Sequence, residues 1–454
     1  MNCLQYVAPF ILLLGVGTLG FPPQVNITQL SSGGKIWALL VAGSDGYGNY
    51  RHQADICHAY QILHLNGIPD ENIIVMMVDD IAYNPDNPTP GIIINSPGGE
   101  DVYHGVPKDY TGKHVNSKTF LHVLTGNKAG VQGIGSGRVI ESGPNDHIFV
   151  NFVDHGGPGI LCFPDDVLAA DDLIGALKNM AQKSQFAKMI LYIEACYSGS
   201  MFDNLLADDL NIFVTTAADP FESSYACYYD EERDTYLGDV FSVNWMEDMR
   251  TETPAVNDLH HQFERVRTRT NTSHVEEYGD LDIGNTKLKD VVGFSMKNMN
   301  SVNSVYELDE PTMDVHDNLH IPKQILLNQL EKYKNGSKRK ELKTKLRSLE
   351  KKRSEVDAVV EKIINNLLDL DEDAKEYIRV GKHSLNKQNY PCYKKLFTLF
   401  SNKCFNIPKN PYVRIHLQKF INMCDAPSLA VEKAMEAIET VCYDEERYAN
   451  FFAQ

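Results

Sequence analysis

Residues 149–157 (FVNFVDHGG) and residues 189–200 (MILYIEACYSGS) decide the fold of this chain. Each is an apolar run, rich in β-branched and aromatic residues, that stops at a reactive side chain and then reaches glycine. Such runs are typical of buried strands in a parallel sheet. Reactive groups collect at the carboxyl ends of these strands. The two runs therefore predict two buried strands that bring His155 and Cys196 to one edge of a sheet.

Further apolar runs alternate with helical patterns. Strands are expected at 36–42, 73–78, 147–153, 189–194 and 212–217, and helices at 50–66 and near 170–182. This alternation predicts an α/β fold with a mostly parallel sheet of at least five strands, flanked by helices. Residues 84–117 are rich in Pro, Gly, Asn and Tyr and predict a long irregular excursion.

The pattern changes after about residue 290. Residues 300–322 have the composition of a linker, residues 338–370 have the apolar spacing of a long amphipathic helix, and the tail that follows has no strand-like run. Four of the nine cysteines, Cys392, Cys404, Cys424 and Cys442, lie in this tail. They predict two disulfides with three possible pairings. The alternative is that the four cysteines bind zinc, but the tail has no C-x-x-C spacing, so a metal site is disfavoured. A separate, all-helical module is expected.

Charge is unevenly distributed along the chain. The net charge of −18 disfavours a nucleic-acid partner. Residues 1–322 carry 18 Lys and Arg against 43 Asp and Glu, whereas residues 323–353 carry 12 against 3. The basic segment is either a solvated linker face or a segment that docks on the acidic body and is released by a change of pH.

The N-terminus is typical of a secretory signal. Residues 6–20 are apolar but too short for a confident membrane span, and no other segment is apolar enough to cross a bilayer. N-x-S/T triplets at Asn26, Asn271 and Asn335 are expected glycosylation sites in the secretory route.

His155 and Cys196 together suggest nucleophilic catalysis. A buried cysteine or histidine alone is more often structural. As a pair at matched strand ends, they favour a thiol nucleophile with its base. Gly156 and the Cys196 amide are then expected to stabilise the oxyanion, because glycine lets the main chain approach closely. The histidine precedes the cysteine, which argues against the papain arrangement.

Several longer motifs carry a family resemblance. They are residues 48–55 (GNYRHQAD), 79–83 (DDIAY), 87–91 (NPTPG), 105–112 (GVPKDYTG), 154–156 (DHG), 194–196 (EAC), 222–230 (ESSYACYYD), 238–239 (GD) and 242–246 (SVNWM). The chain resembles the legumains, which are asparaginyl endopeptidases with a caspase-like fold. The resemblance is dense over 35–300 and looser in the tail, where the cysteine spacing resembles the legumain prodomain.

The resemblance implies a role for each matching residue. Cys196 would be the nucleophile, His155 the base, and Asn49 the residue that orients the histidine. Asp154 would be a candidate for succinimide formation. The pocket for the residue before the cut would be built by Arg51, His52, Glu194, Ser223, Ser224 and Asp239. Such a mechanism needs no metal and no cofactor.

A pocket of mixed charge suits asparagine. The side-chain amide offers an acceptor to Arg51 and two donors to Glu194 and Asp239. The same pocket would repel an ionised aspartate. At low pH a protonated aspartic acid could imitate asparagine, so weaker cleavage after Asp is expected there.

The resemblance also organises the whole chain. It implies a signal peptide at 1–20, a short propeptide at 21–34, a catalytic domain at 35–300, an activation segment at 301–335, and an inhibitory prodomain at 336–454. Acid would weaken the docking of the basic segment, with self-cleavage at Asn335 or Asn328. The expected partners are peptide and protein substrates, the chain's own prodomain and cystatin-type inhibitors. The expected location is a lysosome, another acidic vesicle or the exterior.

Three alternatives remain open. Many legumains have Glu directly after the nucleophile, where this chain has Tyr197, and a peptide ligase acting at Asn is the runner-up. A membrane-anchored transamidase subunit is disfavoured, because no membrane segment follows the catalytic region. A non-catalytic binding protein would be favoured by loss of His155 or Cys196, and both are present.

Overall fold

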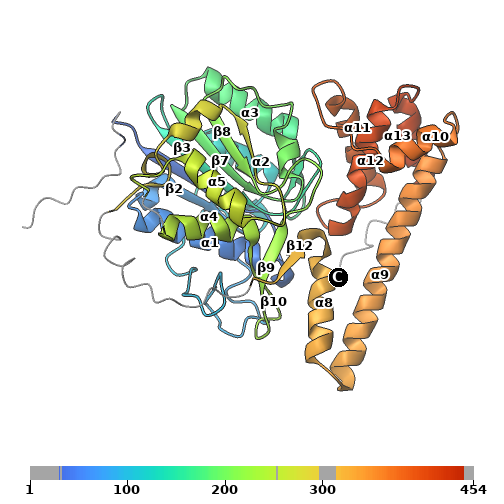
Figure 1. The fold of residues 1–454 in the computed structure, drawn as a ribbon, viewed down its shortest axis with the longest axis horizontal. Coiled ribbons are helices and arrows are strands. Elements are labelled where there is room, and N and C mark those ends of the chain that lie inside the picture. The colour runs from blue at the N-terminus through green and yellow to red at the C-terminus, as the bar shows by residue number, and fades with distance from the viewer. Residues whose placement is uncertain (1–29, 31–32, 252–253, 296–312, 444–454) are drawn as a thin grey trace, which may run out of the picture.

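The computed structural model describes Leu30 and residues 33–251, 254–295 and 313–443. Two parts lie side by side (Figure 1): an α/β body made by the described residues up to 295, and a helical arm made by residues 313–443. The expected signal, most of the expected propeptide and Asn26 lie outside the described residues.

The body is built on a six-stranded sheet in the order β11-β8-β7-β3-β1-β2. The strands are β1 (Ile36–Ala42), β2 (Ile73–Met76), β3 (His147–Val153), β7 (Lys188–Glu194), β8 (Ile212–Thr216) and β11 (Glu276–Gly279). All neighbours run parallel except β11, which pairs antiparallel with β8. The predicted mostly parallel sheet is confirmed. Sequence reasoning missed β11, because its sequence EEYG has no apolar run.

Helices cover both faces of the sheet. One face packs against α1 (Tyr50–Leu65), α4 (Val240–Thr251) and α5 (Leu259–Arg269), and the other against α2 (Ser117–Leu124) and α3 (Ala170–Gln182). Successive strand residues point to opposite faces, so Leu40 joins the first core and Leu39 the second. A short helix, α6 (Lys289–Val292), contacts β3.

Two small sheets flank the large one. The first joins β4 (Gly156–Gly157), β5 (Ile160–Cys162) and β6 (Val167–Ala169); the second has the order β10-β9-β12. β9 (Tyr225–Asp230) and β10 (Thr235–Asp239) belong to the body, whereas β12 (Val315–Asp317) comes from the arm. The described part of the expected linker, residues 313–322, contains this strand, and residues 300–312 lie outside the described residues.

The arm is helical, as predicted. It contains α8 (Ile321–Lys332), α9 (Gly336–Asn365), α10 (Glu372–Val380), α11 (Tyr390–Lys403), α12 (Leu417–Asp425) and α13 (Val431–Val441). Disulfides join Cys392 to Cys424 and Cys404 to Cys442, which selects one of the three pairings and leaves no thiolate there for zinc. None of the helices within the described ranges is long and apolar enough to cross a bilayer.

The register of the sheet defines one functional edge. Ala42 pairs with Val153, and Val153 pairs with Glu194, so β1, β3 and β7 end at the same level. The next residues along each strand therefore meet at this edge, where His155 and Cys196 were expected.

Candidate active site

His155 lies beside Asn49, the residue that precedes α1. The Nε2 atom of His155 is 3.0 Å from Asn49 Oδ1. The Asn49 amide nitrogen donates to the Asp45 carbonyl, so its oxygen faces the histidine and accepts the Nε2 proton. This contact selects the tautomer that leaves Nδ1 bare. His155 Nδ1 is buried without a hydrogen-bond partner, which suits a base that waits for a proton.

Cys196 is buried in this arrangement. The residue comes two positions after Glu194, where β7 ends, and it is 1% exposed. Its Sγ atom lies 3.8 Å from Ser224 Oγ. Burial, and then the charge of Asp317, raises the pKa of the Cys196 thiol to about 12. The thiol is therefore protonated in this closed arrangement.

Gly156 brings the main chain against Cys196. A Cβ atom at position 156 would lie 2.3 Å from the Cys196 carbonyl oxygen, so only glycine fits there. The close approach places the backbone of β4 against the backbone of Cys196. Tyr197, the next residue, has a left-handed backbone with φ of 57° and donates its N–H to the Glu222 carbonyl.

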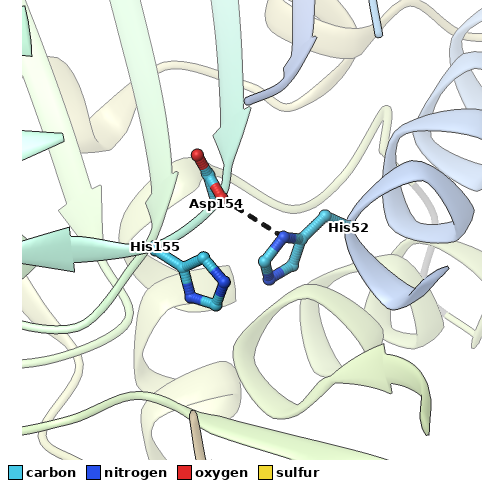
Figure 2. Close-up of side chains that lie close together, drawn as sticks. All are labelled: His52, Asp154 and His155. Atoms are coloured by element: carbon cyan, nitrogen blue, oxygen red, sulfur yellow. Dashed lines mark ion pairs between the residues drawn. The ribbon is translucent and has the colours of Figure 1, made fainter. Parts of the chain in front are cut away.

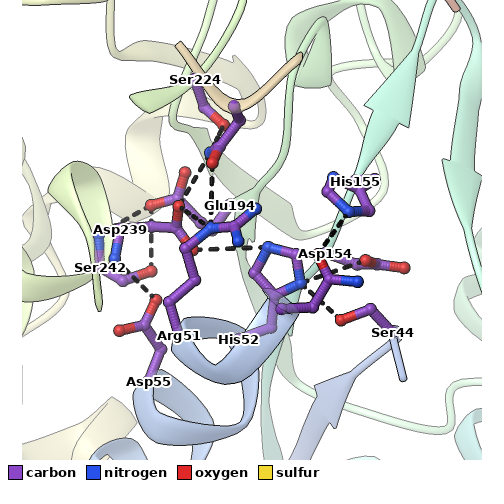
Figure 3. A network of polar contacts seen from close by, with 12 residues as sticks. Ser44, Arg51, His52, Asp55, Asp154, His155, Glu194, Ser224, Asp239 and Ser242 are labelled. Atoms are coloured by element: carbon purple, nitrogen blue, oxygen red, sulfur yellow. Dashed lines mark hydrogen bonds and ion pairs between the residues drawn. The ribbon is translucent and has the colours of Figure 1, made fainter. Parts of the chain in front are cut away.

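An asparagine of the arm occupies the expected specificity pocket. Asn318 Oδ1 accepts from Arg51 Nε at 3.0 Å, while its Nδ2 donates to Asp239 Oδ1 at 2.8 Å and to Ser224 Oγ at 2.9 Å. The Asn318 N–H also donates to the Ser224 carbonyl. The pocket thus binds both ends of a side-chain amide. Figure 3 shows Arg51, Asp239 and Ser224, the residues that bind it.

Three buried carboxyls, Glu194, Asp239 and Asp55, lie around the pocket, and Arg51 forms an ion pair with Asp239. Ser242 donates its N–H and its hydroxyl to Glu194 Oε2, whereas Glu194 Oε1 is buried without a hydrogen bond. Burial, and then the Asp239 charge, raises the pKa values of Glu194 and Asp55 well above their usual range. Burial also raises the pKa of Asp239, although Arg51 opposes that shift. The pocket therefore carries fewer negative charges than its carboxyl count suggests.

His52 connects the pocket to Asp154. Its Nδ1 lies 2.6 Å from Ser44 Oγ and 3.3 Å from Asp154 Oδ1, and its Nε2 lies 3.6 Å from Asp239 Oδ2. His52, Asp154 and His155 converge (Figure 2) and are close enough to share an ion. Ser44 and Asn49 already engage the two rings. An exposed group of Asp219, Glu222 and His274 has similar spacing.

The structure does not bring every expected residue to the site. Ser223 makes none of the hydrogen bonds to the Asn318 amide. Asn328 lies on α8 near Tyr236 OH, and Asn335 is exposed at the start of α9. The pocket residue is instead Asn318, so the expected cleavage points lie elsewhere in this arrangement. Sequence reasoning also missed Ser44, Asp55 and Ser242. Ser44 could have been found, because it follows a buried strand.

The arm inserts a second group, Arg414, into the body at Cys162. Arg414 is fully buried in a 3-10 helix (Pro411–His416), and its Nη1 donates to Cys162 Sγ at 3.2 Å. Burial, and then the Arg414 charge, lowers the pKa of His155 well below its usual range. A cation beside His155 therefore favours the neutral imidazole.

Tyrosines and two lysines hold the arm on the body. Tyr390 OH donates to the Gly159 carbonyl and Tyr393 OH to the Pro158 carbonyl. Lys394 pairs with Asp171 and Asp172, and Lys409 pairs with Asp165. The basic segment at 323–353 was expected to make the main electrostatic contact, but these lysines lie outside it. Lys332 of the basic segment does form an ion pair with Asp234 of the body.

Comparison with known proteins decides the family. Residues 36–295 match the peptidase C13 family model. The chain belongs to the peptidase C13 family. Residues 344–442 match the legumain prodomain. This C13 chain is 46% identical to legumain of Homo sapiens, covering 93% of this chain and 95% of that protein. It is 40% identical to vacuolar-processing enzyme beta-isozyme 1 of Oryza sativa subsp. japonica, covering 90% and 85%.

The family confirms the predicted activity class. A C13 peptidase with a legumain prodomain is a cysteine-type asparaginyl endopeptidase made as a zymogen. Among solved structures, caspase-1 of Spodoptera frugiperda is similar over 58% of this chain and 90% of its own, with a TM-score of 0.33 and 11% identity.

Proposed function

We propose that Cys196 and His155 cleave the peptide bond that follows an asparagine held between Arg51 and Asp239. The observation that carries this assignment is the Asn318 amide, which Arg51, Asp239 and Ser224 bind at both its oxygen and its nitrogen. A pocket that satisfies a buried amide discriminates strongly against side chains that leave its polar groups unpaired.

The proposed mechanism uses the two nitrogens of His155 differently. Nδ1 takes the Cys196 proton, while Nε2 stays bonded to Asn49. The thiolate attacks the carbonyl carbon, and the Gly156 and Cys196 amides stabilise the oxyanion. The C–N bond then breaks, and the imidazolium protonates the leaving amine. Water, deprotonated by His155, releases the acyl group and restores the thiol. An amine in place of water gives the ligase reaction.

Other assigned roles rest on the same geometry. Burial raises the pKa of Asp154 well above its usual range, which supports a neutral carboxyl of the kind that closes a succinimide. Glu194 and His52 complete the pocket from behind Asp239. Binding of cystatin-type inhibitors remains an expectation from the family resemblance. Disulfides in the arm and the exposed Asn271 side chain of its N-x-S triplet support a secretory or lysosomal location.

The segment in the pocket is arranged to resist cleavage. Asp317 Oδ1 accepts the N–H of Leu319, the amide that would leave, and the chain then turns into a 3-10 helix (Asn318–His320). Arg353 donates to the Leu319 carbonyl. Asp317 also helps to keep the pKa of the Cys196 thiol high, after burial. The pocket is therefore filled by a peptide whose scissile bond is restrained.

Replacing Asn318 tests which asparagine is cut during activation. The variants Asn318→Gln, Asn328→Gln and Asn335→Gln are held at acid pH and followed by intact-mass measurement. The restraints on the bond after Asn318 belong to the closed arrangement, so we expect the wild type to yield a product ending at Asn318 only at acid pH, where the arm loosens. Only Asn318→Gln should lose it, because the pocket rejects an extra methylene by about 10- to 200-fold.

A wild-type product that ends at Asn335, and that vanishes only in Asn335→Gln, would instead support the sequence-based cleavage point. It would show that the arm rearranges before it is cut.

Acid should release the arm partly through His416. Burial, and then Lys419, lowers the pKa of His416 to about 4, although Asp357 opposes the shift at 3.0 Å. Lys419 and Asp357 both belong to the arm, so the neutral imidazole contributes to the stability of the folded arm; this contribution is present above pH 6.5 and is lost as the pH falls toward 4. At pH 5 the loss is about 2 kcal/mol. Burial lowers the pKa values of His52 and His155 in the same direction.

The variant His416→Gln removes one of these protons. In a Cys196→Ala background, which prevents cutting, we expect its release midpoint to move about half a pH unit toward acid. Release is followed by hydrogen exchange of the 3-10 helix that carries Arg414. The control is His104→Gln, at an exposed histidine of the body. Equal midpoints in the two variants would contradict the role of His416.

A further inference from the structure

The arm occupies a sheet edge that its departure leaves open. β12 pairs antiparallel with β9, with Val315 opposite Cys227, His316 opposite Ala226, and Asp317 opposite Tyr225. The Asn318 N–H bond to Ser224 continues this ladder to the pocket. A free edge strand binds an extended peptide through its main chain and reads alternate side chains. A substrate with asparagine in the pocket is expected to lie along β9 in this register.

The side chain three residues before Asn318 enters an apolar cluster. Val315 packs, together with Met313, against Cys227, Val240 and Val243. The last three are buried and come from β9 and from the first turn of α4. Tyr225 and Tyr228 form the partly buried border. The surface offers methyl groups, a thiol and aromatic rings, and buried Asp55 and Asp239 lie near enough to raise the pKa of Cys227 after burial.

The opposite face of the same strand differs. His316, two residues before Asn318, points to the other side, where its ring lies 5.8 Å from that of Tyr236 in an edge-to-face arrangement. Adjacent substrate positions therefore meet different surfaces, and the register can be tested one residue at a time.

We propose that Cys227, Val240 and Val243 form a specificity subsite for an apolar side chain three residues before the asparagine of a substrate. This inference rests on the proposed binding of that asparagine between Arg51 and Asp239. A valine or leucine gains by leaving water at this position. A charged side chain loses its hydration without gaining a partner.

The test uses acid-activated enzyme and quenched fluorescent peptides with X-Ala-Ala-Asn before the cut. We expect kcat/KM to fall about 3- to 10-fold from X = Val to X = Ala, and at least about 30-fold to X = Lys or Asp. A second series, Ala-X-Ala-Asn, should not reproduce this order. The variant Val243→Thr keeps the shape of the side chain but makes it polar. In this variant the ratio of kcat/KM for X = Val to that for X = Ala should approach one. Val256→Thr, at an exposed valine, should leave the ratio unchanged.

The outcomes distinguish a failure of the proposed subsite from a failure of the proposed asparagine pocket. Equal cleavage of all X peptides, with strict dependence on Asn kept, overturns the subsite and leaves the asparagine pocket intact. If the Ala-X-Ala-Asn series shows the apolar preference instead, the substrate does not lie along β9 in the register of β12. Equal cleavage after Asn and Gln overturns the pocket itself. If Val243→Thr does not fold, the two peptide series on the wild type still decide the proposal.

Discussion

We expect Cys196→Ala to abolish peptide hydrolysis after asparagine, with a fall in kcat of at least about 10⁴-fold. The alanine removes the only atom that can form the acyl intermediate, and no neighbouring group replaces it in the proposed mechanism. The fold and acid release of the arm are expected to persist, because the thiol makes one weak contact with Ser224. Activity is measured on an Asn peptide after separately added active enzyme has cut the arm away. Folding is measured by thermal denaturation.

Cys57→Ala is the matched control. This cysteine is also fully buried, and its Sγ contacts Met77 on the other side of α1 from the pocket. It should lose a similar small amount of stability and keep its activity. Residual, Asn-dependent hydrolysis by Cys196→Ala above the level of an uncatalysed blank would contradict the nucleophile assignment.

Arg51→Met should lower kcat/KM for asparagine peptides by about 10²- to 10³-fold, since the amide oxygen loses its donor inside a buried pocket. The structure adds a second effect that the sequence did not predict. Asp239 loses its ion pair at 3.1 Å, and a buried carboxylate without a partner costs about 3 kcal/mol of folding free energy.

This stability loss depends on pH. Arg51 opposes the burial that raises the pKa of Asp239, so removing Arg51 raises this pKa further. The variant should therefore be least destabilised at acid pH, where the carboxyl is neutral, and most destabilised near neutrality. Kinetics at pH 5 and denaturation at pH 5 and 7 separate binding from folding.

Arg233→Met tests whether burial alone explains the result. Arg233 is also buried, but it pairs with Asp230 at the end of β9, away from the Asn318 amide. It should lose stability without a change in preference among Asn, Gln and Asp. If Arg51→Met keeps the wild-type preference, the pocket model is wrong.

The parallel core was predictable because its signal is local. β1, β3 and β7 are buried on both faces, so each forms an apolar run in sequence, and the predicted bounds match to within a residue. α1 and α3 follow the same logic through their apolar spacing and the residues that end them. By contrast, β11 and β12 are short, polar strands that exist because β8 and β9 present a free edge.

The reactive residues were also visible in the sequence. His155 and Cys196 lie at strand ends, and a parallel sheet brings strand ends together whatever the loops do. Family motifs added Asn49, Arg51 and Asp239, whose roles remain predictions.

The sequence by itself determined the α/β fold, the helical tail, the reactive pair and the family, since each depends on the local order of side chains. Only the tertiary structure decided that Asn318 fills the pocket, that Arg414 lies beside Cys162 and that Lys394 and Lys409, outside the basic segment, pair with the body. These contacts join residues far apart in the chain. Their formation depends on the three-dimensional packing of the arm, which no local pattern of charge or hydropathy encodes.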